Sequence, residues 1–282
     1  MLLSHKDIDV NIISMKYDED LDQCTSEFYR EVTPLYQAAG FCDNPKIVQL
    51  LLDHKNIDIN AIIKIREEQY YTFTRKKFDP RNIEETALYA AIDNEKFENV
   101  RILLAQENID VKFKFKYYRQ NKLNREISML ERAVSKKNLD VLQLLLNDKR
   151  FDVNEKVSFR SWNDDEDVWD EEKIKETKLI HQEENNERSG SSTIYSSNKK
   201  ISILHYALYF YNIDAVKVKL LLGNENIDVN AYSFLKGYEH TLTSSGGENE
   251  TKKLEEKTPL YFAVERENYE IVKLLVDHKN ID

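Results

Sequence analysis

Short apolar runs recur along the chain, and each is spaced like one face of a helix. The runs are VQLLL at 48–52, VRILL at 100–104, LQLLL at 142–146, VKLLL at 218–222 and VKLLV at 272–276. In the first of them, Ile47, Val48, Leu51 and Leu52 stand at i, i+1, i+4 and i+5, which gives a helix a wide apolar stripe. Each run therefore predicts a helix that contacts both a partner helix and a neighbouring unit.

A second phrase precedes each apolar run and opens with serine or threonine. Its copies are TPLYQAA at 33–39, TALYAA at 86–91, SMLERAV at 128–134, SILHYAL at 202–208 and TPLYFAV at 258–264. The opening hydroxyl can accept a hydrogen bond from the free N–H groups of a helix start. Pro34 and Pro259 follow it, at a helical position that tolerates a missing N–H. The phrase predicts a first, shorter helix.

A third phrase follows each apolar run. Its copies are HKNIDIN at 54–60, ENIDVK at 107–112, KRFDVN at 149–154, ENIDVN at 225–230 and HKNID at 278–282, with a further copy, HKDIDVN, at 5–11. We expect its first asparagine to end the second helix in a left-handed conformation, at Asn56, Asn108, Asn226 and Asn280. The unit is then a helix–turn–helix with an extended connection. Because one helix pair cannot bury its apolar faces alone, neighbouring units must stack.

Together the three phrases resemble the ankyrin repeat family, whose signature is T-P-L-H-x-A followed by a leucine run and a β-turn. His205 keeps the histidine of that signature, whereas Tyr36, Tyr89 and Tyr261 replace it. The resemblance implies an all-α fold, an α-solenoid of helix–turn–helix repeats, with elongated β-hairpin fingers on one edge. We expect repeats at 33–60, 86–112, 128–154, 202–230 and 258–282, the last of them incomplete, and the tail of a truncated repeat at 1–11.

The repeats are farther apart than the family pattern predicts. Successive openers stand 53, 42, 74 and 56 residues apart, against about 33 in the family. The extra residues follow the third phrase, and their alternation in 62–74, 111–117 and 157–162 predicts enlarged β-hairpins. Such insertions often build a binding edge of a solenoid. Equally, surface loops tolerate extra length at a cost of about 0.6 kcal/mol per doubling.

Charge is spread unevenly over these inserts. Residues 112–125 hold six lysines and arginines and no acid, whereas 164–187 hold eleven acids and three lysines. We expect 163–198 to be a disordered acidic insert, because charge-rich segments of low apolar content cannot build a core. The polar stretch at 244–253 is expected to be a flexible tip.

The basic finger at 111–125 supports an alternative function. Its lysines alternate with aromatic residues, at Phe113, Phe115, Tyr117 and Tyr118, as in sites for single-stranded nucleic acid. The same alternation fits a strand with its aromatic residues packed inward and its lysines outward. The formal net charge of −10 argues against a general attraction to nucleic acid or to anionic membranes. Nucleic acid is therefore the less favoured partner.

The sequence contains no catalytic or metal-binding motif of the types HExxH, CxxC, GxSxG or Gly-rich phosphate loop. We therefore expect no enzyme activity, no cofactor, no metal and no small-molecule substrate. No apolar stretch reaches the roughly 18 residues that a membrane helix needs, and the N-terminus lacks the pattern of a signal peptide. With Cys24 and Cys42 interpreted as free thiols, these features predict a cytoplasmic protein without a membrane partner.

The resemblance implies a scaffold that binds another protein through the concave face and the hairpin fingers of the solenoid. Aligned on their openers, the units place a variable pair at the end of each first helix, where the family faces its partner. The candidate partner-binding residues are Phe41, Asp93, Asn94, Lys136, Tyr209, Phe210, Tyr211, Glu265 and Arg266.

Three alternatives accompany this interpretation. The adjacent aromatic residues at 209–211 match a binding hot spot, or they pack beneath the long insert at 155–201. Neither end of the chain carries a polar capping repeat, which suggests a segment of a longer array or association through the open ends. The chain could also be the interaction segment of a larger multidomain enzyme.

Overall fold

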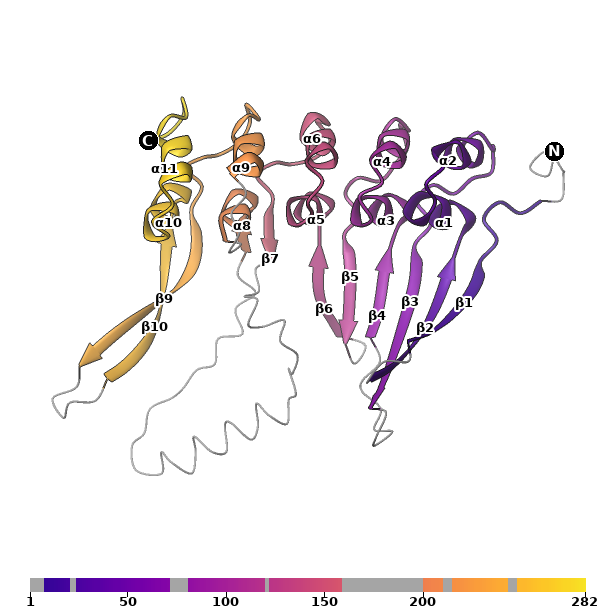
Figure 1. The fold of residues 1–282 in the computed structure, drawn as a ribbon, viewed down its shortest axis with the longest axis horizontal. Helices are drawn as coiled ribbons and strands as arrows, with labels where there is room; N and C mark the ends of the chain where they lie inside the picture. The colour runs from indigo at the N-terminus through magenta and orange to yellow at the C-terminus, as the bar shows by residue number, and fades with distance from the viewer. Residues whose placement is uncertain are drawn as a thin grey trace.

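The computed structural model describes residues 8–20, 24–71, 81–119, 122–158, 200–209, 215–242 and 248–282. Five helix pairs stack side by side in chain order, and strands extend from one side of the stack (Figure 1). The inner helices, nearer the strands, are α1 (Pro34–Phe41), α3 (Ala87–Asp93), α5 (Met129–Ser135), α8 (Ile203–Tyr209) and α10 (Pro259–Glu265). The outer helices are α2 (Pro45–Leu52), α4 (Phe97–Leu104), α6 (Leu139–Asn147), α9 (Ala215–Leu222) and α11 (Tyr269–Val276). We number the pairs as units 1 to 5 and call them the helix layer.

Each inner helix begins at the hydroxyl residue that the sequence predicts. The side-chain oxygen accepts the backbone N–H three residues later, over 3.0–3.4 Å, at Thr33, Thr86, Ser128, Ser202 and Thr258. Asparagine side chains cap three of the outer helices by accepting backbone N–H groups two or three residues later, at Asn44, Asn138 and Asn268. The predicted helix starts are therefore confirmed.

The apolar runs of neighbouring units form one continuous core. The leucine two residues after the opener is at most 1% exposed in units 1 to 4, at Leu35, Leu88, Leu130 and Leu204. In the outer helices, the central leucines Leu103, Leu145 and Leu221 are wholly buried. The cluster of buried residues extends from Val32 to Leu275. Stacking of the helix pairs is therefore what removes these apolar stripes from water.

Asparagine side chains join the loops of neighbouring units. The asparagine that ends the third phrase donates a hydrogen bond from its side-chain amide to a backbone carbonyl in the loop of the next unit. Its side-chain oxygen accepts a hydrogen bond from a backbone N–H of that same neighbouring loop. Asn60, for example, donates to the Asn108 carbonyl and accepts from the Asp110 N–H, both over 2.8 Å. The same pair of bonds is made by Asn11, Asn154 and Asn230. We call this series the asparagine ladder.

The left-handed helix ends predicted at Asn56, Asn108, Asn226 and Asn280 are wrong. Among the described residues other than glycine, left-handed backbone occurs at Glu95 and Glu267, which lie between an inner and an outer helix. Asp53, the residue that directly follows helix α2, has a right-handed conformation. Instead, the backbone carbonyl groups of these four asparagines accept hydrogen bonds from the ladder asparagines. Each loop is therefore held by a residue from outside that loop and needs no left-handed residue.

One rung of the ladder is replaced by an arginine. Lys112 occupies the ladder position of unit 2, and its ammonium group cannot accept a hydrogen bond. From unit 3, Arg150 donates instead to the carbonyl oxygens of Leu104 and Gln106, over 2.6 and 3.2 Å. The residue that links units 2 and 3 therefore belongs to the later unit, whereas each ladder asparagine belongs to the earlier unit.

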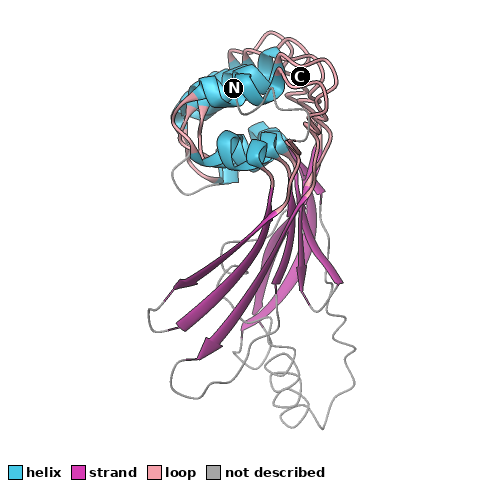
Figure 2. Cartoon of the chain, turned by 90° about the vertical axis from the view of Figure 1, so that its right-hand side faces the viewer, coloured by secondary structure: helices cyan, strands magenta, loops and turns pink. Residues whose placement is uncertain are grey.

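The inserts between units form β-hairpins, and three of these join edge to edge. One antiparallel sheet, in chain order, contains β1 (Ser14–Asp20), β2 (Cys24–Val32), β3 (Ile63–Tyr71), β4 (Arg81–Glu85), β5 (Phe115–Arg119) and β6 (Lys122–Ile127). Two further pairs are β7 (Lys156–Ser158) with β8 (Lys200–Ser202), and β9 (Ser233–Leu242) with β10 (Glu248–Lys257). Seen along the stack, the strands run away from the helices on one side (Figure 2). We call these strands the hairpin layer.

The all-α fold class is only partly supported, because the predicted hairpins join into a six-stranded sheet, and the reason is geometric. Neighbouring helices pack about 8–10 Å apart, and two paired strands about 4.8 Å apart fill nearly the same width. A stack with one hairpin per unit therefore brings the edge of each hairpin within pairing distance of the next. In this way β2 pairs with β3, and β4 pairs with β5.

The predicted hairpin fingers are confirmed as a class, although their bounds differ. The strand expected at 111–117 begins at Phe115, and the tip expected at 244–253 overlaps β10, which begins at Glu248. The acidic insert predicted at 163–198 lies outside the described residues. None of the described helices is long and apolar enough to cross a membrane.

Candidate functional site

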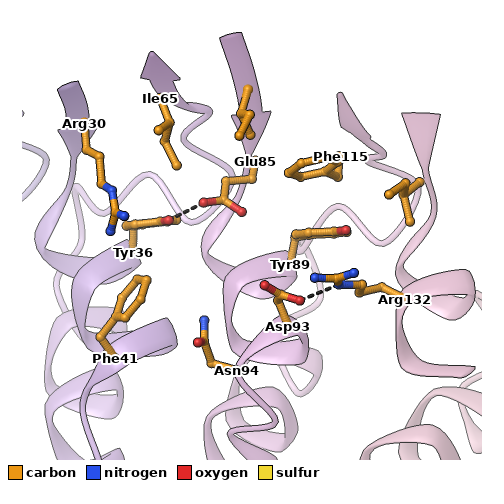
Figure 3. Close-up of a pocket in the computed structure, with 12 residues that line it drawn as sticks. Arg30, Tyr36, Phe41, Ile65, Glu85, Tyr89, Asp93, Asn94, Phe115 and Arg132 are labelled. Atoms are coloured by element: carbon orange, nitrogen blue, oxygen red, sulfur yellow. Dashed lines mark hydrogen bonds and ion pairs between the residues drawn. The ribbon is translucent and has the colours of Figure 1, made fainter. Parts of the chain in front are cut away.

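A cavity of about 330 Å³ lies where the hairpin layer meets the ends of α1 and α3 (Figure 3). Its apolar lining comes from Ile65, Ile83 and Phe115 of the strands and from Phe41 at the end of α1. Polar and charged side chains complete the wall, namely Arg30, Tyr36, Glu85, Asp93, Asn94 and Arg132. We call the sheet face that lines this cavity the inner face.

A buried carboxylate links units 1 and 2 at the top of the cavity. The Tyr36 hydroxyl donates a hydrogen bond to Glu85 Oε1, and both side chains are almost fully buried. Burial raises the pKa of Glu85 to about 7, although the hydrogen bond from Tyr36 acts in the opposite direction. Burial and the neighbouring Glu85 also raise the pKa of Tyr36. Glu85 therefore changes charge near neutral pH.

An ion cluster closes the other side of the cavity. Asp93, the last residue of α3, accepts a bond from Arg132 Nε, and the Lys136 ammonium lies 2.7 Å from the same carboxylate oxygen. Partial burial would raise the pKa of Asp93, but the bonds from Arg132 and Lys136 outweigh it and lower the pKa. Asp93 is therefore held as a carboxylate between units 2 and 3.

Aromatic rings give the cavity stiff walls. The Tyr36 and Phe41 rings lie 5.7 Å apart and are tilted by 53°. Tyr89 stacks on Phe115, with ring centres 5.0 Å apart and 19° between the planes. Of these four rings, Phe41 is the exposed one, at 41% of its surface. Phe41 therefore offers a large apolar contact at the mouth of the site.

The structure gathers four of the predicted partner-binding residues here and places two others, Glu265 and Arg266, in unit 5. Phe41, Asp93 and Asn94 line the cavity, and Lys136 belongs to its ion cluster. In unit 5, Glu265 pairs with Lys257 over 2.6 Å, and the Arg266 guanidinium lies 4.9 Å from the Phe262 ring centre. The Tyr209 side chain, Phe210 and Tyr211 lie outside the described residues.

The sequence did carry a sign of the residues that were missed. Tyr36 occupies the place of the signature histidine, and in unit 4 that place is held by His205. His205 Nε2 donates to the Lys257 carbonyl over 2.9 Å, directly before the next opener, while its Nδ1 accepts from Ser202 over 2.7 Å. Tyr36 makes the equivalent link through the Glu85 side chain. The sequence pattern that indicates the buried Tyr36–Glu85 pair is thus a tyrosine in place of the signature histidine, together with a glutamate directly before the next opener.

The opposite, outer face of the sheet balances its own charges. One register row runs across β3 to β6 and alternates in sign, through Lys64, Glu84, Lys116 and Glu126. Within it, Lys116 Nζ lies 3.2 Å from Glu84 Oε2, which also accepts a bond from the Tyr118 hydroxyl over 3.2 Å. A second cavity of about 480 Å³ lies on this side and includes Met15, Tyr29 and Arg66. Opposite charges facing each other across neighbouring strands stabilise the sheet.

No group of three or more His, Cys, Asp or Glu side chains in the described part of the chain is placed to hold a metal ion. The candidate site therefore consists of an aromatic and aliphatic cavity bordered by ion pairs. Such a surface can bind a partner by apolar burial and charge pairing.

Comparison with known families agrees with the fold. A family model described as "Ankyrin repeat" matches residues 31–64, and one described as "Ankyrin repeats (3 copies)" matches residues 176–282. The two matches together span half of the chain, and the units between them have the same helix pairs and caps. The chain belongs to the ankyrin repeat family. A comparison with curated proteins gave no match.

Proposed function

We propose that this ankyrin-repeat chain is a scaffold that binds another protein on the inner face of the hairpin layer and at the adjoining ends of the inner helices. Ankyrin repeats are generally modules for protein–protein interaction. The observation that carries the proposal is the cavity itself, because Phe41, Asp93 and Asn94 reach it from two successive units. A concave site with apolar walls and a few fixed polar groups is the usual form of a binding site.

The contacts of the basic finger favour its interpretation as a strand rather than a nucleic-acid site. Phe113 and Phe115 pack against the core, and Phe115 is stacked on Tyr89. Lys116 is engaged by Glu84. A stacking platform for bases needs rings that are open to solvent, so we propose a protein rather than a nucleic acid as the partner. We also propose that the chain has no catalytic activity and a cytoplasmic location.

The test uses a partner isolated with the full chain and two variants of similar size. Phe41→Ala removes the exposed ring of the cavity, whereas Leu50→Ala removes an apolar side chain that is 56% exposed on the outer helix α2. We expect Phe41→Ala to weaken partner binding at least about tenfold, as loss of a central aromatic contact does, and Leu50→Ala to change it by less than about twofold. Isothermal titration calorimetry on both variants measures the difference.

The remaining candidate residues have their own test. A double variant, Tyr209→Ala with Phe210→Ala, should also weaken binding while leaving the melting temperature unchanged if these residues contact the partner. A lower melting temperature with unchanged affinity assigns them to the core. If Leu50→Ala weakens binding and Phe41→Ala does not, the partner binds the outer helices and the proposal is wrong.

A further inference from the structure

The hydroxyl group of Tyr89 is a buried polar group without a hydrogen-bond partner among the residues that the structure describes. The Tyr89 side chain is 1% exposed and lines the cavity, and its ring is stacked on Phe115. Figure 3 shows the hydroxyl group directed toward the side of the cavity where Arg132 lies. Because a buried tyrosine hydroxyl usually has a partner, this group is available to a ligand that enters the cavity.

The repeat pattern explains why the Tyr89 hydroxyl lacks a partner. Tyr36, the equivalent residue of unit 1, donates to the side chain of Glu85, which stands directly before the next opener. The residue directly before the opener of unit 3 is Ile127, and its side chain contains no hydrogen-bond acceptor. Ile127 lines the cavity together with Tyr89. The Glu85 carboxylate therefore has no counterpart at this position between units 2 and 3.

Arg132 of α5 offers further donors at the same junction. Its Nε donates to Asp93, and its side chain is 33% exposed. A guanidinium group has five N–H donors in a planar fork, and the terminal amino groups of Arg132 make no hydrogen bond to a described residue. The charge of Arg132 also opposes the rise in the pKa of Tyr89 that burial causes. The guanidinium group and the Tyr89 hydroxyl can therefore donate to one acceptor.

The charges and the space at this junction can accommodate one more carboxylate. Asp93 carries one negative charge, whereas Arg132 and Lys136, which both contact it, carry two positive charges. The Glu85 carboxylate is already bonded to the Tyr36 hydroxyl. The cavity volume of about 330 Å³ exceeds the roughly 30 Å³ that one water molecule occupies in the liquid. An acidic side chain can therefore enter the cavity.

We propose that the cavity binds the carboxylate of an aspartate or glutamate side chain of the partner protein. The Tyr89 hydroxyl and the terminal amino groups of Arg132 donate to its two oxygens in charge-assisted hydrogen bonds, which are stronger than neutral ones. An apolar side chain next to the acid covers Phe41, which is 41% exposed at the mouth of the cavity. The net charge of −10 opposes an acidic partner at long range, so binding depends on these close contacts. This inference rests on the proposed function, because it assigns a chemistry to the partner residue that enters the same site.

Two small peptides that differ in one group test the inference on the full chain. The probe is N-acetyl-Phe-Glu-amide, in which an aromatic ring adjoins the acid, and the control is N-acetyl-Phe-Gln-amide, which has the same shape without the charge. We expect the probe, titrated by NMR at about 50 mM salt, to bind with a dissociation constant of about 1–5 mM. The control should bind at least about fivefold more weakly.

Three outcomes of these titrations would overturn the inference. Equal binding of the two peptides would show that the charge is not recognised, and absence of binding at about 10 mM would show that the cavity does not take an acidic side chain. Acetate that binds as tightly as the probe would indicate a site for a small carboxylate molecule rather than for a residue of a partner protein.

Two tyrosines at equivalent positions provide matched variants. Tyr89→Phe removes a hydroxyl group that has no partner in the described structure, so it should weaken binding of the probe at least about fivefold without lowering the melting temperature. Tyr36→Phe removes the hydroxyl group that is bonded to Glu85 and should lower the melting temperature. A melting temperature that falls equally in both variants would show that the Tyr89 hydroxyl is bonded within the fold, which contradicts the inference.

Two arginines provide a second matched pair. Arg132→Gln should weaken binding of the probe at least about fivefold, whereas Arg101→Gln should change it by less than about twofold, because Arg101 lies on α4, is 56% exposed and pairs with Glu98. Circular dichroism shows whether each variant is folded. If Arg132→Gln unfolds, Tyr89→Phe alone decides the outcome. Equal losses of binding at the two arginines contradict the inference.

The isolated partner separates this inference from the proposed function. If Phe41→Ala weakens partner binding but Tyr89→Phe and Arg132→Gln do not, the surface is a binding site and the acidic residue is wrong. If none of these three variants weakens partner binding, both the inference and the proposed function fail.

Discussion

The helix layer and the hairpin layer differ in how regularly their contacts repeat along the chain. In the helix layer the same contact returns from unit to unit, as Leu88 and Leu130 are equally buried and Thr86 and Ser128 make the same cap. In the hairpin layer the contacts change, since β5 has five residues and β9 has ten, and the two faces of the sheet differ in charge pattern. Repeated contacts thus hold the stack, while the contacts of the hairpin layer vary from unit to unit.

The largest expected effect lies in the helix layer. Leu103→Ala removes a wholly buried side chain from the outer helix α4 and should lower the free energy of unfolding by about 2–5 kcal/mol, because it leaves a cavity in the core. Leu123→Ala in β6, where the side chain is 51% exposed, should change it by less than about 0.5 kcal/mol. Urea denaturation measures both. Similar losses for the two variants would remove the distinction between the layers.

The asparagine ladder provides the second test. Asn60→Ala removes two hydrogen bonds between units 1 and 2 and should cost about 1–2 kcal/mol of unfolding free energy. Lys112→Asn restores the missing ladder residue between units 2 and 3 and should add about 1 kcal/mol. Denaturation of both variants checks the opposite signs. A destabilising Lys112→Asn would show that the Arg150 link and the ladder exclude each other.

The helix caps are expected to contribute less. Thr86→Ala removes the side-chain oxygen that accepts the Tyr89 N–H and should lower the free energy of unfolding by about 1 kcal/mol. Thr86→Ser keeps the hydroxyl and should retain most of the stability. If the serine variant is as unstable as the alanine variant, packing of the threonine methyl group and not the cap explains the loss.

The remaining test depends on pH and compares two links between units. Because the pKa of Glu85 is about 7 in the fold, against 4.5 when exposed, the unfolded chain loses this proton first as the pH rises, and folding is weakened between those values. The stability of Glu85→Gln relative to the parent chain should therefore increase from about pH 4.5 to 7 and then level off. Thermal unfolding across that range provides the measurement.

The histidine link should respond in the opposite direction. Burial lowers the pKa of His205 to about 4, against 6.5 when exposed, so the unfolded chain gains this proton first as the pH falls. The stability of His205→Gln relative to the parent chain should increase from about pH 6.5 down to pH 4. The same slope in both variants would contradict the assignment of these two buried groups.

The sequence predicted the helix layer because its signals are local. A hydroxyl at Thr86 and an apolar spacing around Leu103 lie within one unit, and each is sufficient to predict its own element. The six-stranded sheet depends instead on the distance between stacked helices, which no single hairpin encodes. Pairs such as Arg30 with Ile65 are therefore not visible in the sequence. The left-handed conformation predicted for the loop asparagines is wrong because their hydrogen-bond partners belong to a neighbouring unit.

The repeat pattern likewise predicts only part of the candidate site. Phe41, Asp93 and Asn94 could be predicted because they hold a fixed position in the repeat. Arg30, Glu85 and Phe115 lie in inserts of variable length and reach the cavity through the sheet. Their positions depend on strand register, which the repeat pattern does not contain.

We propose that the inner face of the hairpin layer recognises the partner while the helix layer supports it. Hydrogen–deuterium exchange of the full chain, with and without its isolated partner, tests this proposal. We expect slower exchange in β2 to β6 and at the ends of α1 and α3 when the partner is bound, with α2, α4 and α6 unchanged. Slower exchange confined to those outer helices would contradict the proposal.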